Sequence, residues 1–199
     1  MIRMRYIGIA LCAVIAVCVG CAVAFAQQST ADNDNFFKGI ELLTGFGTSD
    51  TSFQGKYQMI PVFVDFDFNI KTLPLLKKYL PGMLEFVLEP FAFGVFKPDS
   101  NAEAGINFLL KIGFLPETSR FQPYFKGGVG LLYMSQHLLE QSTQFNFNEP
   151  ASLGFHYFFQ ENVALTLEYR FRHLSNAGMK SPNHGVNTHF ALCGIAYKF

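Results

Sequence analysis

Apolar and polar side chains alternate along several stretches of the chain, each roughly ten residues long. In residues 62–69, valine and phenylalanine fill the even positions, whereas Asp65, Asp67 and Asn69 lie at odd positions. The same period of two recurs in residues 84–89, 106–112 and 165–172. Successive side chains of a β-strand point to opposite faces, so the pattern predicts strands with one apolar and one polar face. After residue 26 no apolar run reaches the ~18 residues that a transmembrane helix needs.

The polar faces of these segments distinguish a membrane barrel from a soluble sandwich of sheets. They carry charges of both signs at mid-strand positions, namely Glu41, Asp65, Asp67, Glu85, Glu89, Lys111, Lys126, Glu168, Arg170 and Arg172. The opposite faces are wide, aromatic and nearly free of charge. Lipid requires this arrangement, because apolar side chains face the acyl chains and charges pair inside a closed barrel. We therefore predict an all-β fold, an antiparallel transmembrane β-barrel of the bacterial outer membrane.

Eight strands account for the alternating segments. They are expected at about 36–47, 56–69, 83–97, 103–115, 121–135, 144–159, 163–173 and 187–199. An even number of strands suits closure, and an eight-stranded interior is filled by side chains. The chain ends on Phe199, a terminal aromatic residue of the kind that bacterial outer-membrane barrels carry. Residues 70–82 contain two prolines that bar a continuous strand, and a short interfacial helix or cap is expected there.

The first 26 residues have the layout of a secretory signal peptide. Arg3 and Arg5 give a basic start, an apolar stretch follows, and Ala24-Phe25-Ala26 ends it as a small-x-small cleavage site. We expect residues 1–26 to be removed and 27–199 to form one barrel domain; an uncleaved anchor is the alternative. Because the other cysteines lie in that leader, the mature chain keeps only Cys193 and has no internal disulfide.

Composition and charge narrow the function further. The chain has 15 Lys and Arg against 15 Asp and Glu, so it lacks the positive charge of a nucleic-acid binder. Only 15% of the residues are charged and 24 are phenylalanine, which fits a membrane protein better than a soluble domain. No cluster has metal-ligand spacing and no dinucleotide motif occurs, so neither a metal nor another cofactor is expected.

A histidine and a serine near the C-terminal end of the seventh segment form a candidate catalytic pair. By strand parity His173 continues the outward face of Leu167 and Tyr169, and Ser175 shares that face if the strand persists two more residues. Side chains at such positions are close enough for a hydrogen bond after modest rotation. An imidazole so placed activates a serine by taking its proton and later returning it to the leaving group. The alternative is that both are polar residues at the membrane interface with no catalytic role.

The surrounding sequence resembles the lipid A 3-O-deacylase (PagL) family, whose motif is His-x-Ser-Asn-Ala followed after a short gap by Pro-Asn-x-Gly. This chain has His173-Leu174-Ser175-Asn176-Ala177 and Pro182-Asn183-His184-Gly185. The resemblance implies an eight-stranded outer-membrane barrel that hydrolyses the ester-linked acyl chain at position 3 of lipid A. It implies Ser175 as nucleophile and His173 as general base. Asn176 or Asn183 would donate a hydrogen bond to the oxyanion.

One position departs from the family pattern. The family has glutamate two residues after the motif's last glycine, where this chain has Asn187. An asparagine oxygen can still orient the imidazole, but it cannot offset the charge of the imidazolium. Glu168 is a poor substitute because parity places it on the inward face. His189 shares the parity of Asn187 and is interpreted as an interfacial residue.

The sequence therefore predicts a serine esterase that acts on lipid A at the outer rim of the barrel, with lipopolysaccharide and the outer membrane as its partners. A homodimer is left open. The rival hypothesis is a non-enzymatic small barrel, structural or adhesive, which Asn187 favours. An acyltransferase barrel is disfavoured, because it needs space for an acyl chain where the interior charges are expected.

Overall fold

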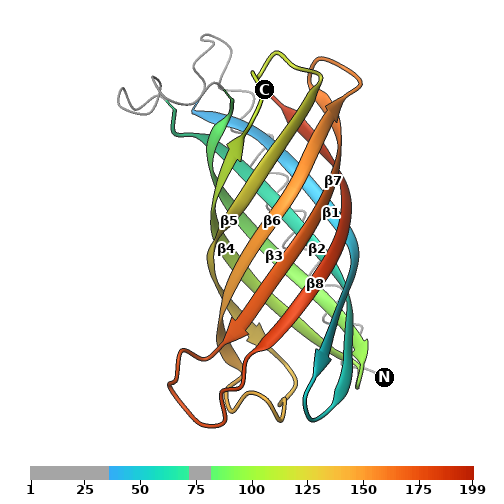
Figure 1. The fold of residues 1–199 in the computed structure, drawn as a ribbon, viewed down its shortest axis with the longest axis vertical. Helices are drawn as coiled ribbons and strands as arrows, with labels where there is room; N and C mark the ends of the chain where they lie inside the picture. Colours follow the sequence, from blue (N-terminus) through green and yellow to red (C-terminus); the bar gives the residue numbers. More distant parts are fainter. Residues whose placement is uncertain (1–35, 72–81) are drawn as a thin grey trace. The chain divides into compact units, whose positions relative to one another are not determined.

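The computed structural model describes residues 36–71 and 82–199, which form a closed antiparallel barrel of eight strands (Figure 1). The strands are β1 (Phe37–Thr51), β2 (Gly55–Asn69), β3 (Leu84–Lys97), β4 (Asn101–Gly113), β5 (Phe121–Met134), β6 (Phe145–Phe158), β7 (Val163–Ser175) and β8 (Val186–Lys198). Each strand pairs with the next, and β8 closes the barrel by pairing with β1. Among the described residues, no helix is long and apolar enough to span a membrane. The predicted eight-stranded fold is confirmed.

Two strands are longer than the sequence pattern indicated. β1 continues to Thr51 and leaves a short turn before Gly55, whereas the strand was expected to end near residue 47. Apolar alternation stops near residue 47, but backbone pairing does not: Asp50 lies opposite Lys56 in the register. The Thr51 hydroxyl donates to the Gly55 carbonyl at 2.8 Å, and Gly55 takes a positive φ of 75° that suits glycine. β7 likewise runs on to Ser175.

Ion pairs fill the half of the interior nearest the β4–β5 and β6–β7 connections, which are the inner turns. Lys111 Nζ lies 2.9 Å from Asp67 and 3.2 Å from Glu41, while Lys126 Nζ lies 2.7 Å from Asp65. These side chains are fully buried. An unpaired charge in such a place would cost several kcal/mol, so mutual pairing is what allows the strands to keep them. The inward parity predicted for these charged residues is confirmed.

The other half of the interior, towards the loops that follow β1, β3, β5 and β7 (the outer loops), is mainly aromatic and also holds the Arg172–Glu103 ion pair. Phe63, Phe91, Phe93 and Phe190 pack against one another, with ring centroids 4.8–6.0 Å apart. Arg170 places its guanidinium 4.0 Å from the Phe63 ring centroid, so the charged and aromatic layers meet at β7. Side chains thus occupy the barrel along its length, as expected for eight strands.

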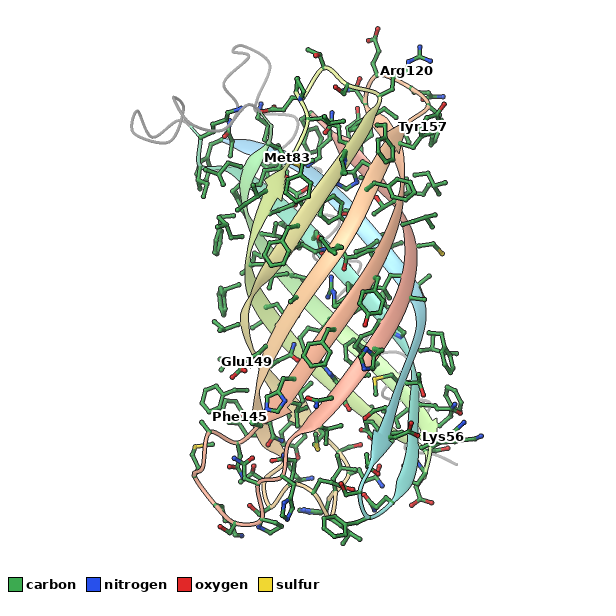
Figure 2. All side chains as sticks on the ribbon, viewed as in Figure 1. Lys56, Met83, Arg120, Phe145, Glu149 and Tyr157 are labelled. Atoms are coloured by element: carbon green, nitrogen blue, oxygen red, sulfur yellow. The ribbon has the colours of Figure 1, made fainter. Side chains whose placement is uncertain are left out.

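The outward face is apolar over the strands (Figure 2). Large exposed hydrophobic side chains recur on all eight strands, among them Leu42, Ile60, Phe86, Phe108, Phe125, Leu131, Leu153, Leu165 and Ile195. A soluble protein rarely exposes so much contiguous apolar surface, whereas a lipid-facing wall requires it. The predicted signal peptide and most of the expected cap over 70–82 lie outside the described residues.

Candidate active site

The outer ends of β7 and β8 bring His173 and Asn187 together. The two residues lie directly opposite each other in the antiparallel register, and both side chains face outward. His173 Nδ1 lies 2.6 Å from Asn187 Oδ1. An amide oxygen only accepts hydrogen bonds, so Nδ1 carries the proton and donates it. In the neutral imidazole Nε2 is then left with a lone pair, which is the state that a general base needs.

Ser175 is the last residue of β7 and lies on the same outward face, half-buried. Its cross-strand neighbour on β6 is Phe147. Two strand residues advance about 6.6 Å, so the hydroxyl and the imidazole are within reach of each other by side-chain rotation. Within the described chain no hydrogen bond joins them. Catalytic hydrogen bonds often form only once substrate is bound, so this geometry is compatible with a serine–histidine pair.

Gly185 supports the His173 ring from the loop between β7 and β8. A Cβ atom built on Gly185 would lie 2.6 Å from Cε1 of His173 and 3.2 Å from Nε2. The residue also has a positive φ of 74°, which L side chains rarely adopt. The last glycine of the motif therefore serves two needs, the turn into β8 and close packing against the imidazole.

Replacing Gly185 by alanine is expected to push the imidazole from its place and to break its hydrogen bond to Asn187. A displacement of about 1 Å at a catalytic group can lower turnover about 100-fold. Gly178→Ala is the matched control, because Gly178 has a φ of 76° but its Cβ would meet nothing within 4 Å. The turnover number of both variants checks the prediction. Equal losses would assign the effect to backbone strain and contradict the role of the contact.

The two asparagines of the motif brace the loop that follows Ser175. The backbone N–H of Asn176 donates to Asn183 Oδ1 at 2.9 Å. The buried Asn176 side chain donates from Nδ2 to the Lys180 carbonyl at 2.7 Å and to Ser142 Oγ at 3.2 Å. Both N–H groups of that amide are therefore occupied. Asn183 is exposed, and no hydrogen bond of its Nδ2 occurs within the described chain, so of the two predicted side-chain donors it is the more available.

Three outer loops are joined above the site. The His184 N–H donates to the Glu140 carbonyl at 3.0 Å, and the Ser142 N–H donates to the Pro182 carbonyl at 3.0 Å. Glu140 also accepts a 2.9 Å hydrogen bond from the Phe53 N–H in the turn between β1 and β2. These contacts tie the β7–β8 loop to the β5–β6 loop, and the β5–β6 loop to the turn between β1 and β2. They restrict the motion of the β7–β8 loop and so help to keep Gly185 against His173.

Ion pairs also fix the inward-facing side chains of β7. Arg170 makes a bidentate pair with Glu89 of β3, with both N–O distances 2.7 Å. Arg172 donates to Glu103 of β4 at 2.6 Å. These bonds cross the barrel, so the strand that carries His173 and Ser175 is anchored from behind.

Other residues considered from the sequence have structural roles. Glu168 faces inward as predicted and accepts hydrogen bonds from Tyr124 at 2.7 Å and from Arg170 at 2.8 Å. His189 lies on the outward face, and its Nδ1 is 2.7 Å from the Tyr169 hydroxyl. Within residues 36–71 and 82–199, no group of three or more His, Cys, Asp or Glu side chains is arranged to hold a metal ion.

Sequence reasoning missed one outward carboxylate. Glu149 of β6 lies directly opposite His173 in the register, on the side of β7 away from Asn187. It is exposed, and it shares its parity with Phe145 and Phe147 on that strand. Parity alone would have placed it outward; only the pairing register brings it next to His173.

A shallow groove lies on the outer wall below the site, over β6, β7 and β8. Its volume is about 680 Å³. Leu153, Leu167, Tyr169, Ala191 and Cys193 provide outward side chains that line it. Tyr169 is four residues along β7 from His173, a separation of about 13 Å. Ala191 and Cys193 on β8 are small beside their partners Tyr169 and Leu167 on β7, and this leaves the hollow.

A closed barrel with an apolar outer wall and an ion-paired interior defines the protein as an outer-membrane β-barrel. The model of the lipid A 3-O-deacylase (PagL) family matches residues 63–196, which run from β2 to β8 and contain the whole motif. The chain belongs to this family, and it lies in the bacterial outer membrane. No curated protein matches it.

Two solved structures share the fold. Neisserial surface protein A (NspA) is 17% identical with a TM-score of 0.62, and the alignment covers 81% of this chain and 97% of that one. The outer membrane enzyme PagL is 16% identical with a TM-score of 0.57, over 77% of this chain and 97% of that one. Identity this low shows the fold alone. Neither the family match nor these structures support the homodimer that the sequence left open.

Proposed function

We propose that the protein is a lipid A deacylase that hydrolyses the ester-linked acyl chain at position 3 of lipid A. The observation that carries the proposal is the placement of the His173–Asn187 pair. It lies on the outward face at the outer end of the barrel, two residues from Ser175. A substrate that meets this face is a lipid of the outer leaflet. Membership of the deacylase family supports the same substrate.

The proposed reaction has two steps. Ser175 Oγ attacks the ester carbonyl while His173 Nε2 takes its proton, and the tetrahedral intermediate forms. The intermediate collapses as the C–O bond to the sugar breaks and the imidazolium returns the proton to the leaving hydroxyl oxygen. Water, deprotonated by the same Nε2, then attacks the acyl-serine. A hydroxy fatty acid leaves, and both side chains regain their starting states.

Asn187 is assigned the task of orienting the base. Its oxygen holds the proton on Nδ1 of His173, so that Nε2 stays available. Asn183 is assigned the role of stabilising the oxyanion, because the side-chain amide of Asn176 already donates both of its N–H groups, to Ser142 and to the Lys180 carbonyl. In this role Asn183 Nδ2 would donate to the oxygen that becomes negative in the tetrahedral intermediate.

The groove over β6, β7 and β8 is proposed to seat the acyl chain. It follows the same three strands as the site, and a chain attached at Ser175 would reach Tyr169, six residues away along β7, after about 20 Å. Apolar contact along the wall would position the ester, because each buried methylene contributes about 0.8 kcal/mol.

Filling this groove should weaken the reaction without touching the catalytic side chains. Ala191→Phe is expected to remove contact with about two methylenes and to lower kcat/KM about tenfold for long acyl chains. Ala104→Phe on β4 adds the same bulk to an outward position elsewhere on the wall. Comparing the two variants on long-chain and short-chain esters measures the effect. If both variants lose the same activity, the groove has no such role.

Two alternative functions were considered, an acyltransferase and a non-enzymatic barrel, and different observations argue against each. An acyltransferase would need room for an acyl chain inside the barrel, and the ion pairs and phenylalanines that fill the interior argue against it. A non-enzymatic barrel is favoured only by the asparagine at position 187. The hydrogen bond that Asn187 makes to His173 weakens that argument, because the residue still orients the base.

The direct test uses the purified barrel, folded in detergent and incubated with lipid A. Wild type is expected to release fatty acid, and Ser175→Ala is expected to release none above background. Ser181→Ala, in the same loop but exposed, should behave like wild type. Release at a similar rate by Ser175→Ala would refute the serine mechanism, and no release by folded wild type would favour the non-enzymatic barrel.

A further inference from the structure

His173 has a carboxylate neighbour on the side that its hydrogen bond leaves free. In the register of β7, His173 lies opposite Asn187 of β8 on one side and opposite Glu149 of β6 on the other. All three side chains face outward. Directly opposed residues on adjacent antiparallel strands have Cβ atoms about 4.5–5.5 Å apart. Glu149 is therefore the nearest strand neighbour of His173 apart from Asn187 and the residues of β7 itself.

An exposed carboxylate on this wall is unusual. Figure 2 shows Glu149 projecting from the outside of the barrel, on the strand whose outer end carries Phe145. Of the acidic residues in the described strands, only Asp50 and Glu149 are exposed. Asp50 lies opposite Lys56 at the tip of the first hairpin. Glu149 is set further into its strand, and in the described part of the chain it makes no ion pair or hydrogen bond.

We propose that Glu149 is a positioning residue for His173 that supplies the negative charge lacking at Asn187. The inference rests on the deacylase function proposed above. When Nε2 takes the proton of Ser175, the imidazole becomes a cation at the edge of a low-dielectric layer. The neutral amide of Asn187 keeps Nδ1–H in place but does not balance that charge. A carboxylate on the next strand stabilises the cation through space, without a bond to the ring.

The two neighbours thus divide the task that one carboxylate performs in a serine triad. Asn187 fixes the tautomer through its 2.6 Å hydrogen bond. Glu149 lowers the energy of the imidazolium in both steps of the reaction, since His173 gains and returns a proton in each. This division of roles accounts for a family member that lacks the acidic residue at position 187.

The test measures kcat and KM for lipid A with the folded barrel. Glu149→Gln is expected to lower kcat about 10- to 100-fold with KM nearly unchanged, because only the charged state of His173 is affected. Glu149→Asp should recover most of the loss. Asp50→Asn, which removes the other exposed strand carboxylate, should behave like wild type. Asn187→Glu should make Glu149 dispensable, so that the double variant with Glu149→Gln regains activity.

The outcomes separate this inference from the function on which it rests. Active wild type, inactive Ser175→Ala and a Glu149→Gln variant equal to Asp50→Asn would overturn the role of Glu149 alone. A Glu149→Gln variant with raised KM and unchanged kcat would also overturn it, because Glu149 would then contact substrate. Inactive folded wild type would instead overturn the deacylase proposal.

Discussion

His173→Ala is expected to lower the turnover of lipid A on the order of 1000-fold or more and to leave KM nearly unchanged. The side chain lies on the outer wall, so its removal opens no cavity in the barrel interior. What is lost is the group that takes the proton of Ser175 and returns it to the leaving oxygen. Steady-state kinetics with the detergent-folded barrel measure both constants.

His189→Ala is the matched control for this variant. His189 lies on the same outward face of β8 as Asn187, and its Nδ1 is 2.7 Å from the Tyr169 hydroxyl rather than near Ser175. Its turnover should stay close to that of wild type. A His173→Ala enzyme that retains more than about a tenth of wild-type turnover would show that another group acts as the base.

Arg170→Met is expected to destabilise the folded barrel by about 3–5 kcal/mol, because it leaves buried carboxylates without their main partner. Arg170 forms the bidentate pair with Glu89 and also donates to Glu168 at 2.8 Å. Lys126 remains beside both carboxylates, 3.3 Å from Glu89 and 3.0 Å from Glu168, but one cation cannot replace two. The denaturant midpoint of the refolded barrel measures the effect.

Arg120→Met controls for the loss of an arginine as such. Arg120 lies exposed in the turn before β5, and surface substitutions of this kind change stability by less than about 0.5 kcal/mol. Equal midpoints for the two variants would mean that the interior charges are dispensable. That result would contradict the account of why β7 is held rigid behind the active site.

Strand parity accounts for most of what the sequence could predict. A period of two assigns every side chain to one of two faces, so Asp65 and Lys111 were predicted to face inward and His173 to face outward. The lipid environment strengthens this signal, because an outward charge is costly in hydrocarbon. Where the signal fades, as at the Ser49–Thr51 end of β1, the strand boundary was misplaced.

Register and loop geometry account for what the sequence could not predict. Nothing along the chain says which residue of β6 lies opposite His173, so the proximity of Glu149 emerges only from the pairing. The contact of Gly185 with the imidazole depends on how the β7–β8 loop folds back. The same folding engages both N–H groups of the Asn176 amide within the loop layer, which the motif alone does not reveal.

The most direct test of the central claim is mass spectrometry of lipid A from cells that make this protein, beside cells that make the Ser175→Ala variant. We expect lipid A to lose one hydroxyacyl chain with wild type and to keep it with the variant, while both barrels are folded in the outer membrane. Intact lipid A with both proteins, or the same loss with both, would contradict this expectation.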